Sequence, residues 1–193
     1  VERMALDIPG KETEYLGDLA RGLDAFVIAQ AKVKIPEIPE RFFNCAFVID
    51  RHGEVIHKHY KLQVFAREHS TVPHDVWDQW VELFGDGLDA FYPVKDTEIG
   101  RLGCLICMEG SYPETARGLA MNGVELIYRP SYPEPYVGNG LWEVQNRARA
   151  LDNTAYVLAP NPAGYAPSAD SPFPLDMFGG QSMIVDYQGR VIA

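Results

Sequence analysis

Basic residues are scarce in this sequence. Seventeen Lys and Arg residues stand against 27 Asp and Glu residues, which gives a net charge of −10 and an isoelectric point near 4.9. Nucleic acids and anionic membrane surfaces repel such a surface, so we expect neither as a partner. A small molecule without a high negative charge suits this balance better.

Cysteine is also rare, and long apolar runs are absent. The three cysteines form an odd set, which gives no disulfide framework. No apolar run approaches the ~20 residues that cross a bilayer, and no signal peptide opens the chain. These features favour a reducing, cytoplasmic setting. The sequence starts at Val1 rather than at a methionine, which leads us to expect an earlier segment.

The apolar content is sufficient for one sizeable core. With 193 residues, 47% of them hydrophobic, we expect a single domain over residues 1–193. Periodicity and turn signals predict strands alternating with helices, which is typical of an α/β fold. The predicted strands cover 25–33, 42–50, 54–62, 90–96, 99–108, 124–130, 154–161 and a hairpin at 179–193; the predicted helices cover 8–26, capped by Thr13, 112–122, 141–153 and a short one within 66–87.

Two segments resemble each other: "FVIDRHGEVI" at 47–56 and "MIVDYQGRVI" at 183–192. Each has an apolar run, an Asp, two residues, a Gly and another apolar pair. Two explanations stay open. The segments are either hairpins with similar turn chemistry or parts of two related halves that form a two-sheet sandwich.

The stretch "RLGCLICMEGSYPE" at 101–114 makes Cys107 a candidate nucleophile. An apolar strand ends at this cysteine, and Ser111, Pro113 and Glu114 predict a capped helix start just beyond it. Ligands bind at the carboxyl ends of strands in α/β sheets, and a helix N-terminus favours a thiolate. A redox pair with Cys104 is the alternative, but residues three apart on a strand face opposite sides.

A thiolate nucleophile needs a base and a donor for the developing oxyanion. The five histidines all precede Cys107, and we expect those of the first hairpin to be exposed. Strand alternation places His57, His59 and Lys61 on one face. Lys61 is either a surface residue or a buried cation that faces a pocket, and spacing does not separate these possibilities.

These segments together resemble the nitrilase superfamily of carbon–nitrogen hydrolases. The similarity lies in "LICMEGSYPETARGLAMNGVELIYRPS", "RARALDNTAYVLAPN" and "GGQSMIVDYQGRVI", and extends back through "IPGKETEYLGDLAR" and "FVIDRHGEVIHKHYKL". The resemblance implies a four-layer α-β-β-α sandwich of two similar halves. It also implies a Cys–Glu–Lys triad that works without cofactor or metal.

The resemblance assigns catalytic roles to particular residues. Cys107 matches the nucleophile, and Lys61 matches the lysine that stabilises the oxyanion together with a backbone N–H, here that of Met108. Glu68 matches a further glutamate that some members use after the lysine. The general-base glutamate belongs to a strand before the first helix, and Glu2 lies too close to that helix to match it. We therefore expect the chain to be truncated at both ends, or else to be an inactive fragment or binding scaffold.

The segment "CMEGSYPE" is most similar to aliphatic amidases and formamidases, which implies hydrolysis of a small amide with release of ammonia. N-carbamoyl amino acid hydrolases and nitrilases are the alternatives. Arg129 is a candidate for holding a substrate carboxylate or for a structural salt bridge. Tyr132 and Trp142 are candidates for lining the pocket or for packing. The resemblance also implies a homo-oligomer.

Overall fold

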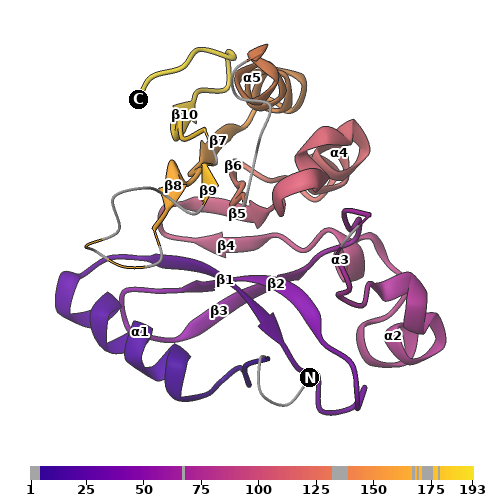
Figure 1. The fold of residues 1–193 in the computed structure, drawn as a ribbon. Coiled ribbons are helices and arrows are strands. Elements are labelled where there is room, and N and C mark those ends of the chain that lie inside the picture. Colours follow the sequence, from indigo (N-terminus) through magenta and orange to yellow (C-terminus); the bar gives the residue numbers. More distant parts are fainter. Residues whose placement is uncertain are drawn as a thin grey trace. The chain divides into compact units, whose positions relative to one another are not determined.

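The computed structural model describes residues 5–66, 68–131, 139–166, 168, 170, 176–177 and 179–193. The chain forms two compact units, Val1–Lys95 and Asp96–Ala193. Each unit has helices packed against a β-sheet (Figure 1), so the predicted α/β class is confirmed.

The first unit contains a three-stranded antiparallel sheet in the order β1-β2-β3. Its strands are β1 (Val27–Val33), β2 (Phe43–Ile49) and β3 (Val55–Tyr60). The central strand β2 is buried almost throughout, which agrees with its continuous apolar sequence. Helix α1 (Lys11–Leu23) packs on β1 and β2.

Helix α1 begins differently from the sequence prediction. Gly10 is the N-cap, and Thr13 lies three residues further on, where its hydroxyl accepts a hydrogen bond from the Gly10 N–H at 2.9 Å. Thr13 therefore closes the first turn from inside the helix, and its predicted position at the cap is wrong.

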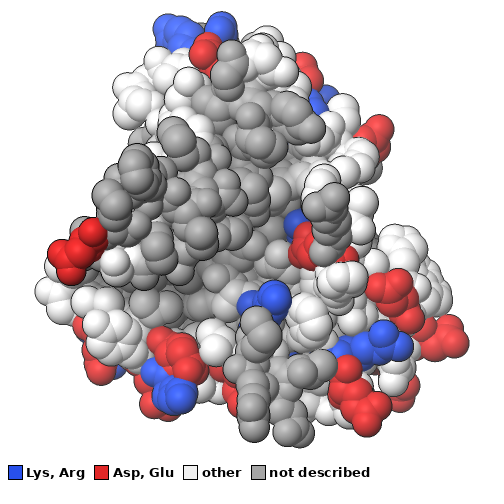
Figure 2. Space-filling view, viewed as in Figure 1, with Lys and Arg blue, Asp and Glu red and all other residues white. Residues whose placement is uncertain are grey.

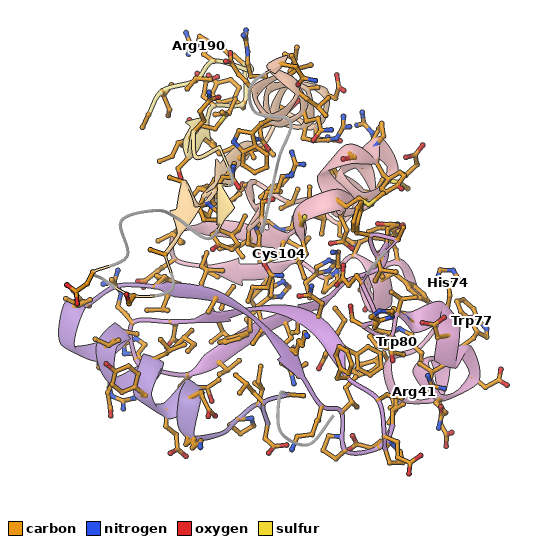
Figure 3. All side chains as sticks on the ribbon, viewed as in Figure 1. Arg41, His74, Trp77, Trp80, Cys104 and Arg190 are labelled. Atoms are coloured by element: carbon orange, nitrogen blue, oxygen red, sulfur yellow. The ribbon has the colours of Figure 1, made fainter. Side chains whose placement is uncertain are left out.

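An aromatic cluster follows the first sheet in the chain. It belongs to η1 (Pro73–Val76), α2 (Trp77–Phe84) and α3 (Leu88–Phe91). Trp80 packs against Phe84 with 4.3 Å between ring centroids, and Trp77 stacks on Phe91; Figure 3 labels the two tryptophans. The strand predicted over 90–96 is therefore largely wrong, because helix α3 takes up its start.

The elements of the second unit follow in chain order: β4 (Lys95–Thr97), β5 (Gly100–Cys104), η2 (Cys107–Ser111), α4 (Pro113–Met121), β6 (Leu126–Tyr128), α5 (Leu141–Asn153), β7 (Tyr156–Ala159), β8 (Gly164–Tyr165), β9 (Asp176–Met177) and β10 (Met183–Val185). Five of the strands form one sheet in the order β10-β7-β6-β5-β4. Strands β5, β6 and β7 run parallel, and β10 pairs antiparallel with β7. Helix α5 packs on β7 and β10 and contacts α4.

The two similar sequence segments form the same turn in both units. The Asp50 carboxylate accepts hydrogen bonds from the backbone N–H groups two and four residues later, at 2.9 and 3.0 Å. Asp186 accepts the equivalent two bonds, both at 2.9 Å. Gly53 and Gly189, three residues after each aspartate, have φ of 83° and 75°. Each turn therefore needs an aspartate to accept the backbone N–H groups and a glycine to adopt a positive φ.

Candidate active site

Lys61 is a buried cation in the first unit, directly after β3. It is 2% exposed, and its Nζ lies 2.5 Å from Oε2 of Glu68. The other oxygen of Glu68 accepts hydrogen bonds from Asn44 at 2.8 Å and Ser70 at 2.5 Å. Of the two possibilities left by the sequence, the structure shows the buried one.

The carboxyl group of Glu68 is held in its charged form. Burial acts to raise its pKa, but hydrogen bonds from Asn44, Lys61 and Ser70, with the charge of Lys61, outweigh burial and lower the pKa below the ordinary value of 4.5. Glu68 is thus suited to orient Lys61 and to balance its charge. Asn44 and Ser70 were not expected at the site.

The predicted exposure of the hairpin histidines is confirmed for His52 and wrong for His57 and His59. His57 is 8% exposed and His59 is fully buried. Burial, with smaller effects from His59 and Lys95, lowers the pKa of His57 to about 3. His57 is therefore neutral at neutral pH. Both histidines lie on one face of β3, as the alternation predicted, and this face is buried.

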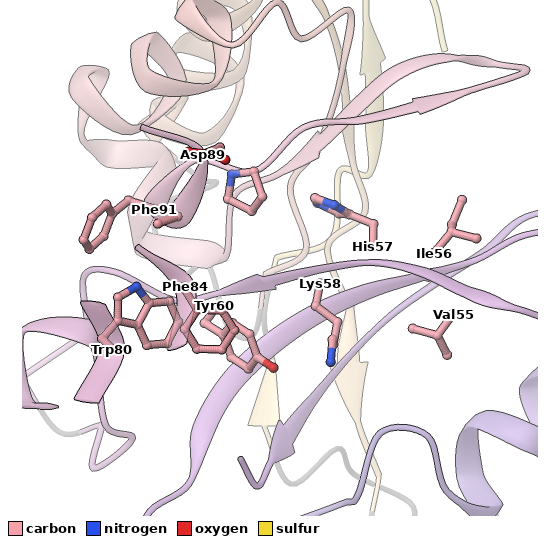
Figure 4. Close-up of a pocket in the computed structure, with 11 residues that line it drawn as sticks. Val55, Ile56, His57, Lys58, Tyr60, Trp80, Phe84, Asp89 and Phe91 are labelled. Carbon is pink, nitrogen blue, oxygen red and sulfur yellow. The ribbon is translucent and has the colours of Figure 1, made fainter. Parts of the chain in front are cut away.

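His57 also lines a pocket of about 320 Å³ in the first unit (Figure 4). The rings of Tyr60, Trp80 and Phe84 gather at one end of this pocket, and Val55 lies at the other. Within the described part of the chain, the Trp80 indole nitrogen and His57 Nε2 have no hydrogen-bond partner. The pocket is lined by Val55, Ile56, His57, Lys58, Tyr60, Trp80, Phe84, Asp89, Ala90, Phe91 and Pro93, so Lys61 is not part of its wall.

Cys107 lies in the second unit, three residues after the end of β5. The strand predicted over 99–108 ends at Cys104, but Leu105 and Cys107 still donate backbone hydrogen bonds to Tyr128 and Pro130, the latter at 2.7 Å. Cys107 then turns out of line with φ of 54° and starts η2. Its side chain is partly exposed, whereas Cys45 and Cys104 are buried; none of the three forms a disulfide bond.

The segment after Cys107 corrects the predicted capping box. Ser111 ends η2, and Tyr112 is the N-cap of α4, with Pro113 in its first turn as predicted. The carboxylate that accepts a backbone N–H here is fully buried Glu109, which binds the amide of Ile106 at 2.6 Å. The cysteine is therefore held by a short 3-10 turn and does not directly precede the longer helix.

Two arginines bind backbone carbonyls of this turn. Arg129, directly after β6, donates from Nε and Nη2 to the Cys107 carbonyl, both at 3.2 Å. Arg149, on α5, donates to the carbonyls of Gly110 at 3.0 Å and Ser111 at 3.3 Å. Arg129 is completely buried, and its guanidinium lies 4.6 Å from the centre of the Trp142 ring.

The structure gives no support to a substrate contact for Arg129 or Trp142. All three nitrogens of the Arg129 guanidinium donate to protein oxygens, which favours its structural alternative. Trp142 is fully buried and donates its indole N–H to the Gln181 carbonyl at 2.9 Å, which favours packing. Met108 lies within η2 beside Cys107. Tyr132 lies outside the described residues.

Asn146 and Arg149 were not predicted from the sequence, whereas Trp142 on the same helix was a candidate. On α5, Trp142, Asn146 and Arg149 are buried and lie on one helix face. The signal was present, because polar residues in phase with a buried tryptophan on a helix must find buried partners.

The described residues include neither a cluster of metal ligands nor a membrane-spanning helix. The described part of the chain holds no group of three or more His, Cys, Asp or Glu side chains placed to bind one metal ion. On the face drawn in Figure 2, acidic side chains are spread among the basic ones, and the described residues present no continuous basic patch. Within the described residues, no helix combines the length and apolar character that a membrane span requires.

The second unit holds a partly exposed cysteine beyond a parallel strand, and the first unit holds a buried lysine–glutamate pair. The model of the carbon–nitrogen hydrolase family matches residues 2–193, and the chain belongs to this family. The expected nitrilase-superfamily membership is thereby confirmed.

Relatives and solved structures agree with this assignment. The chain is 32% identical over 187 residues to omega-amidase NIT2-B of Xenopus laevis. This match covers 96% of this chain and 63% of that protein. It is 35% identical over 158 residues to the probable hydrolase nit2 of Schizosaccharomyces pombe, covering 81% and 54%. The chain thus spans a little over half the length of these relatives. The crystal structure of Saccharomyces cerevisiae Nit3, a nitrilase-superfamily member, matches with a TM-score of 0.74 at 24% identity, covering 95% of this chain and 60% of that one. The fold predicted from the resemblance is confirmed.

Proposed function

We propose that this protein hydrolyses a small primary amide through a thioester on Cys107 and releases ammonia. The observation that carries the proposal is the position of Cys107 itself: a partly exposed thiol at the turn after β5, held by hydrogen bonds to its backbone N–H and carbonyl. The omega-amidase relatives support an amide as the substrate class.

In the proposed reaction, Cys107 Sγ attacks the amide carbon and the carbonyl becomes an oxyanion. Lys61 and the Met108 N–H stabilise that oxyanion, and Glu68 keeps Lys61 charged and oriented. The C–N bond breaks, and nitrogen leaves as ammonia after taking a proton. Water then attacks the thioester, giving a carboxylic acid and the free thiol. The resemblance gives the proton transfers to a glutamate before α1, and described residues 5–10 contain none.

Ammonia release from short primary amides tests the proposal. We expect Cys107→Ala to abolish release, because no other group of the proposed site forms the thioester. Cys104→Ala is the matched control, since this buried cysteine on β5 belongs to the same segment, and we expect it to retain activity.

The thioester is tested directly by intact mass. Parent protein stopped in acid during turnover is expected to carry one acyl group on the peptide that contains Cys107. Ammonia release by Cys107→Ala at the parental rate would contradict the proposal. If the parent released no ammonia, a binding scaffold would be the better account. If mild oxidation removed two hydrogens from the peptide that contains both Cys104 and Cys107, a redox pair would be the better account.

A further inference from the structure

Cys107 has a backbone conformation that a residue with a side chain rarely adopts. Its φ of 54° lies in the left-handed region, which is strained for a residue other than glycine. Such a conformation persists only where surrounding contacts fix it. The Pro130 carbonyl accepts the Cys107 N–H at 2.7 Å, which fixes the peptide before the residue. The peptide after it is fixed by whatever binds the Cys107 carbonyl.

Arg129 supplies that contact, and it is itself held on several sides. Its Nε and Nη2 both donate to the Cys107 carbonyl at 3.2 Å. Nη1 donates to Asn146 at 2.9 Å, Nη2 also donates to Gln145 at 2.7 Å, and Trp142 lies against the guanidinium. Helix α5 therefore fixes the plane of the guanidinium, and the guanidinium fixes the carbonyl.

Gly110 leaves the space that Arg129 occupies. A Cβ added at this glycine would lie 2.0 Å from Arg129 Nε and 2.2 Å from its Cζ. The φ of Gly110 is outside the left-handed region, so alanine is allowed there by the backbone. Substitution of Gly110 by alanine would therefore act through Arg129.

The peptide bond extends this effect to the next residue. The Cys107 carbonyl and the Met108 N–H belong to one planar unit and point in opposite directions. A guanidinium that fixes the carbonyl consequently fixes the direction of the N–H as well. We propose that Arg129 is a positioning residue that aims the Met108 N–H at the substrate oxyanion by binding the Cys107 carbonyl, an inference that rests on the proposed function.

A single NMR signal reports this peptide unit. The sequence contains one Cys–Met pair, at 107 and 108, so protein labelled with 13C-carbonyl cysteine and 15N-methionine gives one carbonyl–amide cross-peak. We expect the cross-peak to move in Arg129→Ala and in Gly110→Ala. In Arg129→Lys we expect a smaller movement, because an ammonium still supplies a donor but lacks the planar fork. Arg147→Ala is the matched control, because Arg147 lies in the same unit and, like Arg129, donates to a backbone carbonyl, that of Gly189. We expect no movement there.

Kinetics of the same variants separate positioning from folding. Per folded molecule, we expect kcat to fall by about 100-fold in Arg129→Ala with KM unchanged, as is typical when a reacting group is misplaced. Gly110→Ala is expected to lower kcat alone but to add nothing to Arg129→Ala, since its effect requires the guanidinium.

The outcomes are distinct. An unmoved cross-peak in Arg129→Ala would overturn the inference, as would an additive loss in the Gly110→Ala, Arg129→Ala double variant. If Arg129→Ala does not fold, Gly110→Ala and Arg129→Lys decide by the same signal. A parent without amide hydrolysis would defeat the proposed function, while the cross-peak would still show whether Arg129 orients the Met108 amide.

Discussion

Lys61 and Glu68 show why a buried charge requires its partner. The Lys61 side chain is 3% exposed and that of Glu68 is 20% exposed, so water screens this ion pair only weakly. Asn44 and Ser70 satisfy the remaining carboxylate oxygen. Such a pair need not stabilise the protein relative to apolar residues, but removal of one partner leaves an uncompensated charge in the interior.

Glu68→Gln is therefore expected to lower the free energy of unfolding by about 3 kcal/mol at neutral pH, because it leaves buried Lys61 without a counter-charge. The pKa of Glu68 is lower in the folded protein than its ordinary 4.5, so its contribution is complete above that pH and is lost as pH falls through the folded pKa. Urea unfolding of parent and variant at a series of pH values measures this. The two curves are expected to converge in acid.

Asp7→Asn is the matched control for this prediction. It removes the charge from an exposed ion pair with Lys34, at 3.1 Å, in the same unit. We expect a cost of about 1 kcal/mol at most. A loss for Glu68→Gln as small as this would mean that the buried pair is effectively solvated.

Residue types and local spacing were sufficient to name candidate residues, but not to predict which of them are buried. Cys107 stood out because an apolar run ends there, and alternation placed His57 and Lys61 on one face. Their depth in the protein depends on other elements, and His57 was wrongly expected to be exposed. The role of Arg129 was equally hidden, because its partners on α5 lie 16 and 17 positions later in the sequence.

At the scale of elements, the repeated turn has the same hydrogen bonds in both units but different neighbours. A Cβ on Gly17 of α1 would lie 2.7 Å from the Gly53 carbonyl, so this helix packs closely against the first turn. The second turn has more room. Sequence similarity was thus sufficient to predict a shared turn, and insufficient to predict how tightly each is packed.

Gly53→Ala is expected to destabilise the protein more than Gly189→Ala. Both substitutions place a side chain at positive φ, at a cost of about 1 kcal/mol. At Gly53 the added Cβ would also lie 1.9 Å from Arg21 Nη1 and 2.9 Å from the Gly17 carbonyl, whereas at Gly189 the nearest atom is 3.3 Å away. We expect the difference to be about 1–3 kcal/mol by urea unfolding, since α1 must shift. Equal losses would show that α1 yields without cost.

Element boundaries were predicted best where one period continues without interruption. Helix α5 begins and ends at the predicted residues, Leu141 and Asn153. The segment after β5 was predicted less well, because Leu105 and Cys107 continue the hydrogen bonding beyond the strand end, to Tyr128 and Pro130. A left-handed cysteine held by a distant arginine leaves no local pattern in the sequence.

At the scale of the whole molecule, the proposed catalytic groups are divided between the two compact units. Lys61 and Glu68 belong to Val1–Lys95, and Cys107 belongs to Asp96–Ala193. Neither unit alone supplies both the thiol and the ammonium that the proposed reaction needs. The family match extends across both units.

Net charge and His57 act in opposite directions on the stability of the molecule in acid. With a net charge of −10, uptake of protons towards the isoelectric point near 4.9 reduces self-repulsion and favours the compact state. His57 opposes this, because its pKa of about 3 in the folded protein lies below the ordinary 6.5. Between these values the unfolded chain binds a proton that the folded protein does not, so stability falls as pH falls, by up to about 1.4 kcal/mol per pH unit.

His57→Phe is expected to remove this loss. The substitution keeps an aromatic ring beside the apolar lining of the 320 Å³ pocket and cannot bind a proton. Urea midpoints are measured between pH 6.5 and 4.5, above the range in which the contribution of Glu68 changes with pH. The parent is expected to lose stability relative to the variant as pH falls across this interval. His52→Gln, in the exposed first turn, is expected to follow the parent. Parallel curves for the parent and His57→Phe would mean that His57 takes up its proton in the folded protein as readily as in the unfolded chain, and that its surroundings admit water.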